Sequence, residues 1–269
     1  MVTKLFENAP VTEVVVEVLW SLQPIVSSPG ASIDPFYQVI TDPLAAKMES
    51  AGFGTTVRRI PEGAPLELFG HQAATMYRSG SDMWPLFQHG PGVFTANTVP
   101  PYEGWSVFAK FLKQGLDIFG SSHAVAAAIT PTNVRLRYLN IFSQSHGVRN
   151  QAAFLRDNLG LDLKLPDAIR SHFMQLRSNV SYAGEISVPI ENTDGLFGFL
   201  NWRTAVDAPT GQPLVSLDLG AVFTFPYPQV SWDVEGIMDK VEKCHYVTSE
   251  WFSSLVSGDL REKLGEVGP

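Results

Sequence analysis

The sequence contains a single cysteine, Cys244, in 269 residues. One thiol excludes an internal disulfide framework and any cluster of cysteine metal ligands. The chain also lacks a run of about 20 apolar residues, which a bilayer-spanning helix would need. Residues 1–30 show no basic start followed by an apolar stretch and a small-residue cleavage site. These absences predict a protein of the reducing cytoplasm that does not bind membranes.

Basic charge is scarce as well. The net charge is −8, and the densest basic spot is the pair Arg58-Arg59. An acidic surface repels phosphate backbones, so nucleic acid is not an expected partner.

Recognisable catalytic and metal-binding patterns are also missing. The chain has no Gly-x-Ser-x-Gly elbow and no Gly-rich phosphate loop followed by lysine. No two histidines stand three or four residues apart, as a helical metal pair requires. The six histidines are His71, His89, His123, His146, His172 and His245. We therefore expect no cofactor and no metal, and the pattern leans away from an enzyme.

Apolar and aromatic residues, by contrast, are plentiful: 45% of the chain is hydrophobic, with 17 Phe, seven Tyr and six Trp. That composition predicts a large packed core. β-Branched or alternating runs predict strands at residues 11–20, 55–57, 73–79, 83–88, 93–99, 133–142, 179–190, 196–206 and 214–225. Apolar residues at helical spacing predict helices at 35–50, 102–119, 149–159, 167–176 and from about 233 onward.

This order of elements predicts an α+β fold with antiparallel sheets. Residues 1–125 and 126–269 form two β-rich halves of similar element order, which suggests a loose repeat within one fused globular unit. Each half ends in one long amphipathic helix, which we expect to cover its sheet.

Three local features refine the expected boundaries. Asp34 precedes Pro35 and fits the N-cap of the first helix. Gly120 fits the residue just after the helix at 102–119. Pro85 demotes the strand at 83–88 to an edge of its sheet, because proline cannot donate to a neighbouring strand.

Two strands carry complementary charges. Glu13 and Glu17 share one face of the strand at 11–20, and Arg135 and Arg137 share one face of the strand at 133–142. We expect the two strands to be partners. The charges then form cross-strand ion pairs, or the arginines bind an anionic ligand bidentately. Two charges of each sign nearly cancel, which favours ion pairs that fix the register between the halves.

The aromatic residues support a further hypothesis. In the strand at 196–206, Phe197 and Phe199 share one face while Leu196, Leu200 and Trp202 share the other. A strand that is apolar on both sides needs a second cover, which indicates an oligomer interface, a groove or an unusually large core. Trp202 is accordingly a candidate contact residue.

Four short motifs resemble those of a sporadically distributed family of bacterial proteins whose function is uncharacterised. They are Asn-Ala-Pro-x-x-Glu from Asn8, Tyr-x-x-Trp-x-x-Phe from Tyr102, Arg-Tyr-Leu-Asn from Arg137, and a C-terminal helix with His245 and an aromatic segment before Leu260-Arg261. The resemblance implies a bacterial or phage cytoplasmic protein with an accessory or defence-linked role. It implies no activity and no catalytic residues.

Two functions stay open at this point. The first is a non-catalytic binding or interaction protein, expected to be a homodimer. The second is a small-molecule carrier or enzyme with an aromatic-lined pocket between sheet and helices. That pocket would use Tyr138, Asn140 and one of the arginines as polar contacts, with His245 near by; on its apolar helix face, His245 also fits a neutral core residue.

Overall fold

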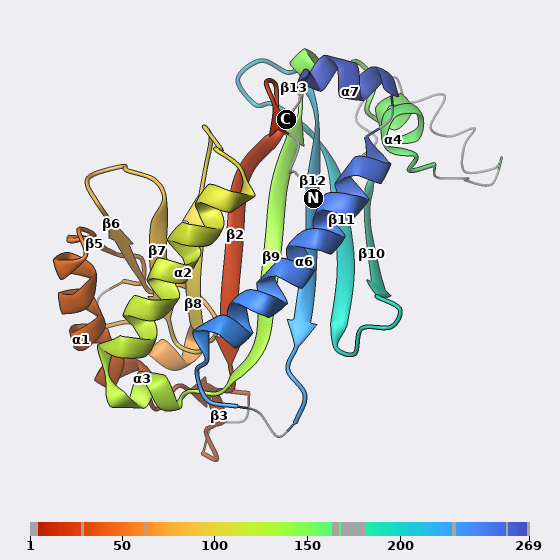
Figure 1. Cartoon of the computed structure of the whole chain (residues 1–269). Helices are drawn as coiled ribbons and strands as arrows, with labels where there is room; N and C mark the ends of the chain where they lie inside the picture. The colour runs from red at the N-terminus through yellow and green to blue at the C-terminus, as the bar shows by residue number, and fades with distance from the viewer. Residues whose placement is uncertain are drawn as a thin grey trace.

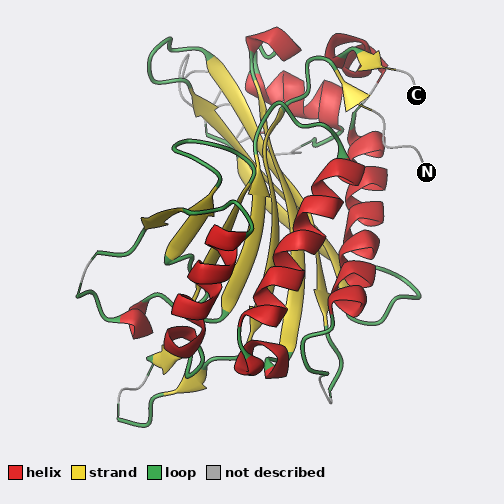
Figure 2. Ribbon diagram, turned by 60° about the vertical axis from the view of Figure 1, so that its left-hand side comes forward, coloured by secondary structure: helices red, strands yellow, loops and turns green. Residues whose placement is uncertain are grey.

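The computed structural model describes residues 5–27, 30–61, 63–162, 167, 181–227, 230–256 and 258–267. Helices lie in front of one large sheet in Figure 1, and Figure 2 shows the same arrangement from the side. The protein is therefore a mixed helix-and-sheet fold, as the sequence predicts.

The elements follow the expected order closely. The strands are β1 (Leu5–Phe6), β2 (Val11–Trp20), β3 (Gln23–Pro24), β4 (Ser32–Ile33), β5 (Thr55–Arg58), β6 (Thr75–Arg78), β7 (Leu86–Gly90), β8 (Val93–Thr98), β9 (Pro131–Phe142), β10 (Ala183–Pro189), β11 (Leu196–Val206), β12 (Pro213–Thr224) and β13 (Glu266–Val267). The helices are α1 (Tyr37–Ser50), α2 (Trp105–Ser122), α3 (Ala124–Ala128), α4 (Gln151–Leu159), α6 (Val234–Leu255) and α7 (Gly258–Leu264), with short 3-10 turns at Leu66–Leu68 and Gln144–His146.

Nine of the described strands form one antiparallel sheet in the order β10-β11-β12-β9-β2-β8-β7-β6-β5. β2 and β9 lie side by side at its centre, which confirms that the two charged strands are partners. The sheet is thus continuous across the boundary between residues 1–125 and 126–269. Two small ribbons, β1-β13 and β3-β4, complete the described strands.

The core lies between the sheet and the long helices. Val14, Val16 and Val18 alternate along β2 and are almost fully buried, because every second residue of a strand faces the same side. In α2, one helical stripe from Trp105 to Phe119 packs on them. α6 crosses β9, β12 and β11 on the same face of the sheet (Figure 1). One hydrophobic core therefore takes residues from both halves of the chain.

Three of the expected boundaries are wrong. Gly120 lies inside α2, which continues to Ser122; a Cβ at this position would lie 2.7 Å from Trp232, so close helix packing explains the glycine. Pro85 precedes β7, which is an interior strand between β6 and β8, so it costs that strand no hydrogen bond. The N-cap of α1 is Phe36 and not Asp34. The Asp34 carboxylate instead accepts hydrogen bonds from the Trp20 indole and from the backbone N–H groups of Phe36 and Gly92.

Two further expectations concern the helix at 167–176 and membrane-spanning helices. The helix expected at 167–176 lies outside the described residues, apart from residue 167. No helix in the described part of the chain combines the length and the apolar character that crossing a membrane would require.

Candidate ligand-binding pocket

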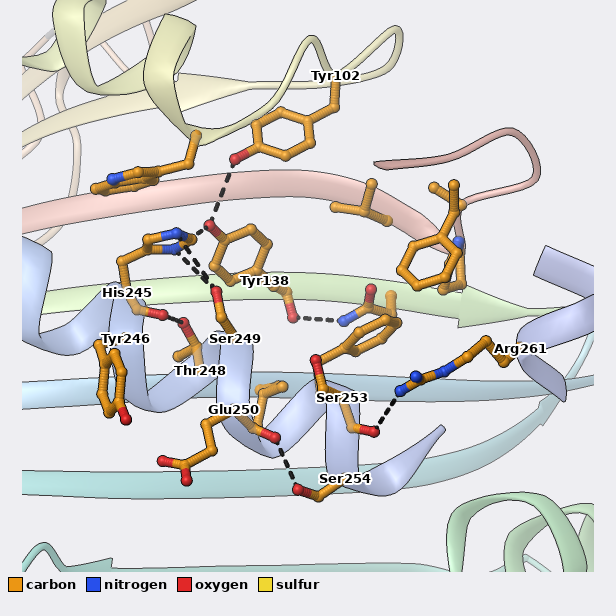
Figure 3. A pocket seen from close by; sticks show the side chains of 18 of the residues that line it. Tyr102, Tyr138, His245, Tyr246, Thr248, Ser249, Glu250, Ser253, Ser254 and Arg261 are labelled. Carbon is orange, nitrogen blue, oxygen red and sulfur yellow. Dashed lines mark hydrogen bonds between the residues drawn. The ribbon is translucent and has the colours of Figure 1, made fainter. Parts of the chain in front are cut away.

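A pocket of about 620 Å³ lies between α6 and the central strands β2, β9 and β12 (Figure 3). The N-terminal segment before β2, the start of α2 and the helix α7 close its sides. The residues that line it are Phe6, Ala9, Pro10, Val11, Tyr102, Trp105, Tyr138, Asn140, Leu219, Glu242, His245, Tyr246, Thr248, Ser249, Glu250, Phe252, Ser253, Ser254 and Arg261.

Regular spacing in the secondary structure places these side chains. His245, Ser249 and Phe252 stand four and three residues apart on α6, so they form one stripe of the helix. Tyr138 and Asn140 are two residues apart on β9 and point to the same side of the sheet. The stripe and the strand face one another across the pocket.

A chain of hydroxyl groups and one imidazole crosses this space. The hydroxyl oxygens of Tyr102 and Tyr138 are 3.4 Å apart, and the Tyr138 hydroxyl lies 3.1 Å from Nδ1 of His245. Ser249 Oγ lies 3.3 Å from Nδ1 and 3.4 Å from Nε2 of the same ring. The groups come from α6, β9 and the loop before α2, and Figure 3 shows them converging.

Trp105 holds one side of the imidazole. Its ring stacks on His245 with centroids 4.2 Å apart and an interplanar angle of 13°. Its indole Nε1 donates to both carboxylate oxygens of Glu242, each at 2.9 Å. A planar partner and a fixed indole restrict the rotation of the His245 ring.

Burial keeps the two tyrosines and the histidine of this hydrogen-bonded chain uncharged at neutral pH. It raises the pKa of Tyr102 to about 12 and the pKa of Tyr138 well above its usual value. It also lowers the pKa of the His245 imidazole to about 4. Desolvation disfavours the charged form of each group and is the largest cause of all three pKa shifts.

The chemistry of the chain follows from these shifts. An imidazole with a pKa of about 4 is a weak base at pH 7, and a phenol with a raised pKa is a weak acid. Both remain good hydrogen-bonding groups for a neutral ligand oxygen or nitrogen. Among the residues that the structure describes, no three His, Cys, Asp or Glu side chains are arranged to hold a metal ion.

The chain matches no protein-family model, no curated protein and no solved structure. The family resemblance carried by the four short motifs therefore stays a prediction, and the pocket has to be interpreted from its own residues.

The structure divides the candidate residues chosen from the sequence between two faces of the sheet. Tyr138, Asn140 and His245 all line the pocket. Asn140 is buried, and its side-chain amide nitrogen donates to two main-chain carbonyls, those of Tyr138 at 3.0 Å and Leu217 at 3.3 Å. It thus braces β9 against β12 beneath the pocket.

The charged candidates lie on the opposite face. Arg135 pairs with Glu17 at 3.1 Å, directly across the β2–β9 register. Arg137 pairs with Asp218 through two hydrogen bonds, at 2.6 and 3.3 Å, instead of with a glutamate of β2. Glu13 accepts a hydrogen bond from Asn97 at 2.8 Å.

Trp202, the remaining candidate, lies outside the pocket. It projects from β11 to the helix-covered side and packs over Gly184 of β10. Its indole Nε1 is buried and has no hydrogen-bond partner among the described residues. Its role in this structure is packing.

Among the polar residues of the pocket, sequence reasoning did not select Tyr102, Ser249 or Arg261 as site residues. Ser249 could have been found from its spacing of four residues after His245 on the predicted helix. Arg261 carried no such signal, because it lies on a separate helix, α7, and helical spacing along α6 does not give the position of α7.

Proposed function

We propose that this protein binds a small organic molecule in the pocket between α6 and the central strands. The observation that carries the proposal is a cavity of about 620 Å³ into which the Tyr102, Tyr138, His245 and Ser249 polar groups converge. Ligand sites typically enclose about 300–1,000 Å³, with apolar and aromatic walls and a few well-placed polar groups. Phe6, Trp105, Leu219 and Phe252 supply such walls here.

The protonation states favour binding over acid–base chemistry. A serine nucleophile would need a base that accepts its proton at neutral pH, and burial makes His245 too weak for that task. The carboxylate of Glu242, next to the Trp105–His245 stack, accepts the hydrogen bonds of the indole with both oxygens. A neutral hydrogen-bonding chain recognises a ligand without needing to transfer a proton.

The plan of the two halves gives the proposal further support. We infer that the halves are a loose repeat: a first strand, a helix, a meander whose last strand pairs with the first, and then a long helix. β2, α1, β5–β8 and α2 follow this order, and β9, α4, β10–β12 and α6 follow it again. In the first half Phe87, Phe94 and Phe119 fill the space under the long helix α2, whereas in the second half a pocket lies along part of α6. The second half is therefore the one suited to a ligand.

Filling the pocket tests the proposal. Ser249 points into the cavity (Figure 3), so Ser249→Trp would occupy it. We expect the wild-type protein to bind one equivalent of the neutral apolar dye Nile red and Ser249→Trp to lose that binding. Fluorescence titration measures both, and native mass spectrometry of the purified wild type would reveal a retained natural ligand.

The matched control is Ser106→Trp, at an exposed serine of α2 outside the pocket lining. This variant should bind the dye as the wild type does. Equal dye binding by Ser249→Trp and the wild type would refute the pocket as the binding site.

A second candidate function is self-association through the other face of the sheet. Phe197 and Ile141 are 41% and 39% exposed there, and the described helices α2 and α6 lie on the opposite face. A second copy of the chain would cover these side chains. Sedimentation would then give a mass near twice 29.5 kDa, and Phe197→Glu would return it to one chain.

A further inference from the structure

We propose that the ligand is a neutral, mainly apolar molecule whose hydroxyl or N–H group donates a hydrogen bond to the side-chain oxygen of Asn140. The inference rests on the proposed function, since it names the class of molecule that the same pocket would take. It follows from an unmet acceptor in the pocket wall and from the uncharged polar groups on the same face of β9.

Asn140 offers the pocket an acceptor and not a donor. The residue lines the pocket and is 3% exposed. Its amide nitrogen carries two hydrogens, and the main-chain carbonyls of Tyr138 and Leu217 accept both. Within the described part of the chain, no group donates to the remaining side-chain oxygen, Oδ1. A buried acceptor without a partner costs free energy, and a donor on the ligand would remove that cost.

The polar groups on the same face of β9 favour a neutral ligand. Tyr138 lies two residues from Asn140 and is hydrogen-bonded to His245, which Ser249 also contacts. Hydroxyls and a neutral imidazole both donate and accept, so they suit an alcohol or an amide. An ammonium group would lose its hydration here without gaining a counter-charge from these residues. A carboxylate has no hydrogen to donate to Asn140.

The two carboxylates of the lining do little for a cationic ligand. Glu242 and Glu250 are both exposed, so water and salt screen them. Glu242 also accepts the Trp105 indole with both oxygens, and the Glu250 carboxylate points away from the Tyr138–Ser249 chain in Figure 3. A neutral donor therefore fits the pocket better than a charged one.

The shape of the pocket suits an elongated apolar body behind this donor. The lining on α6 runs from Glu242 to Ser253, which is roughly 16 Å of helix at ~1.5 Å per residue. The floor beneath this stretch is apolar, with Val11 of β2 and Leu219 of β12. A long hydrocarbon chain would bury apolar surface along it.

A matched series of ligands tests the class directly. 1-Nonanol and methyl octyl ether are isomers, and only the alcohol has a hydrogen to donate. Nonanoate and nonylamine keep a similar chain and carry a negative or a positive charge at pH 7. We expect the full-length protein to bind 1-nonanol about tenfold more tightly than the ether or either ion, a gap of about 1.4 kcal/mol. Displacement of Nile red measures each dissociation constant.

Variants of Asn140 then assign the preference. Asn140→Leu and Asn140→Val remove the acceptor, so each should bind the alcohol and the ether with equal affinity. The matched control is Asn133→Leu, on the same strand but outside the pocket lining, where the side chain bonds to Thr224. This variant should keep the tenfold preference for the alcohol. If neither Asn140 variant folds, the comparison of the two isomers in the wild type decides the question.

Each other outcome overturns the inference. Equal binding of the two isomers by the wild type would mean that no donor is recognised, and a preference for the alcohol that survives in both Asn140 variants would place the acceptor elsewhere. Tightest binding of nonylamine or of nonanoate would mean that a charged side chain sets the class. In all these cases a loss of Nile red binding in Ser249→Trp would leave the proposed function standing. Failure of every ligand in the series and of Nile red to bind would refute both proposals.

Discussion

At the scale of single residues, the most unusual group is His89 on β7. Its side chain is completely buried, and neither ring nitrogen has a hydrogen-bond partner among the described residues. Its ring lies among aromatic neighbours, with centroids 4.9 Å from Tyr37 and 5.7 Å from Phe119. Such a site accepts only the neutral imidazole, and burial lowers the pKa of His89 to about 3.

This shift predicts a loss of stability in mild acid. The folded-state pKa lies below the unfolded value of about 6.5, so the unfolded chain binds more protons between these two values. The contribution to stability is full above pH 6.5 and is lost as the pH falls toward 3. From pH 7 to pH 5, His89 alone should lower the free energy of unfolding by about 2 kcal/mol. Urea unfolding at the two pH values measures the change.

His89→Phe should remove that part of the pH dependence. Burial also lowers the pKa of His245, so this residue keeps its own contribution to the pH dependence of stability in the variant. Phe119→Leu is the control: it perturbs the same aromatic cluster without a titrating group, so it should lower stability equally at both pH values. An unchanged difference between pH 7 and pH 5 in His89→Phe would contradict the assignment.

At the scale of the elements, the ion pairs hold strands together on the face away from the pocket. Arg137 joins β9 to Asp218 of β12, and Arg135 joins β9 to Glu17 of β2. The side chains of Arg137 and Asp218 are 29% and 17% exposed, so water weakens the pair only in part. The bidentate geometry favours a real contribution to the stability of the sheet.

A double-mutant cycle should detect that contribution. Arg137→Ala and Asp218→Asn should each lower the free energy of unfolding by about 1 kcal/mol, with a coupling energy of about 0.5–1 kcal/mol. Neither change touches the pocket, so Nile red should bind both variants as it binds the wild type. Loss of dye binding by a stably folded Arg137→Ala protein would instead place Arg137 in the ligand site.

The strand β9 and its neighbours show which contacts the sequence could predict and which it could not. Alternation along β2 and β9 was enough to predict their pairing and the face of each charge. The partner of Arg137 was not predictable, because Asp218 is 81 residues away and its position depends on the register of β12 against β9. Tyr138, Asn140 and His245 were predicted as pocket residues from face and polarity. The place of Arg261 in the pocket was not predictable, because it lies on the separate helix α7 and the periodicity of α6 does not give the position of α7.

At the scale of the whole molecule, the two halves share their core. Residues of β2, α1 and α2 lie in one hydrophobic cluster with residues of β9, β12 and α6. Nine register pairs join β2 to β9 at the centre of the sheet. Neither half can therefore lose its packing without exposing apolar surface and strand edge of the other, which predicts a single cooperative unit.

Two core substitutions, one in each half, test this cooperativity. Leu112 of α2 and Leu217 of β12 are fully buried, so Leu112→Ala and Leu217→Ala should each cost about 2–5 kcal/mol. If the chain unfolds as one unit, each substitution should speed amide hydrogen exchange equally in β7–β8 and in β11–β12, because the slowest amides exchange through global unfolding. Leu68→Ala, at a position that is 66% exposed, is the control and should leave exchange unchanged in both regions. Faster exchange confined to β7–β8 in Leu112→Ala would show instead that the seam between β2 and β9 separates two units that unfold independently.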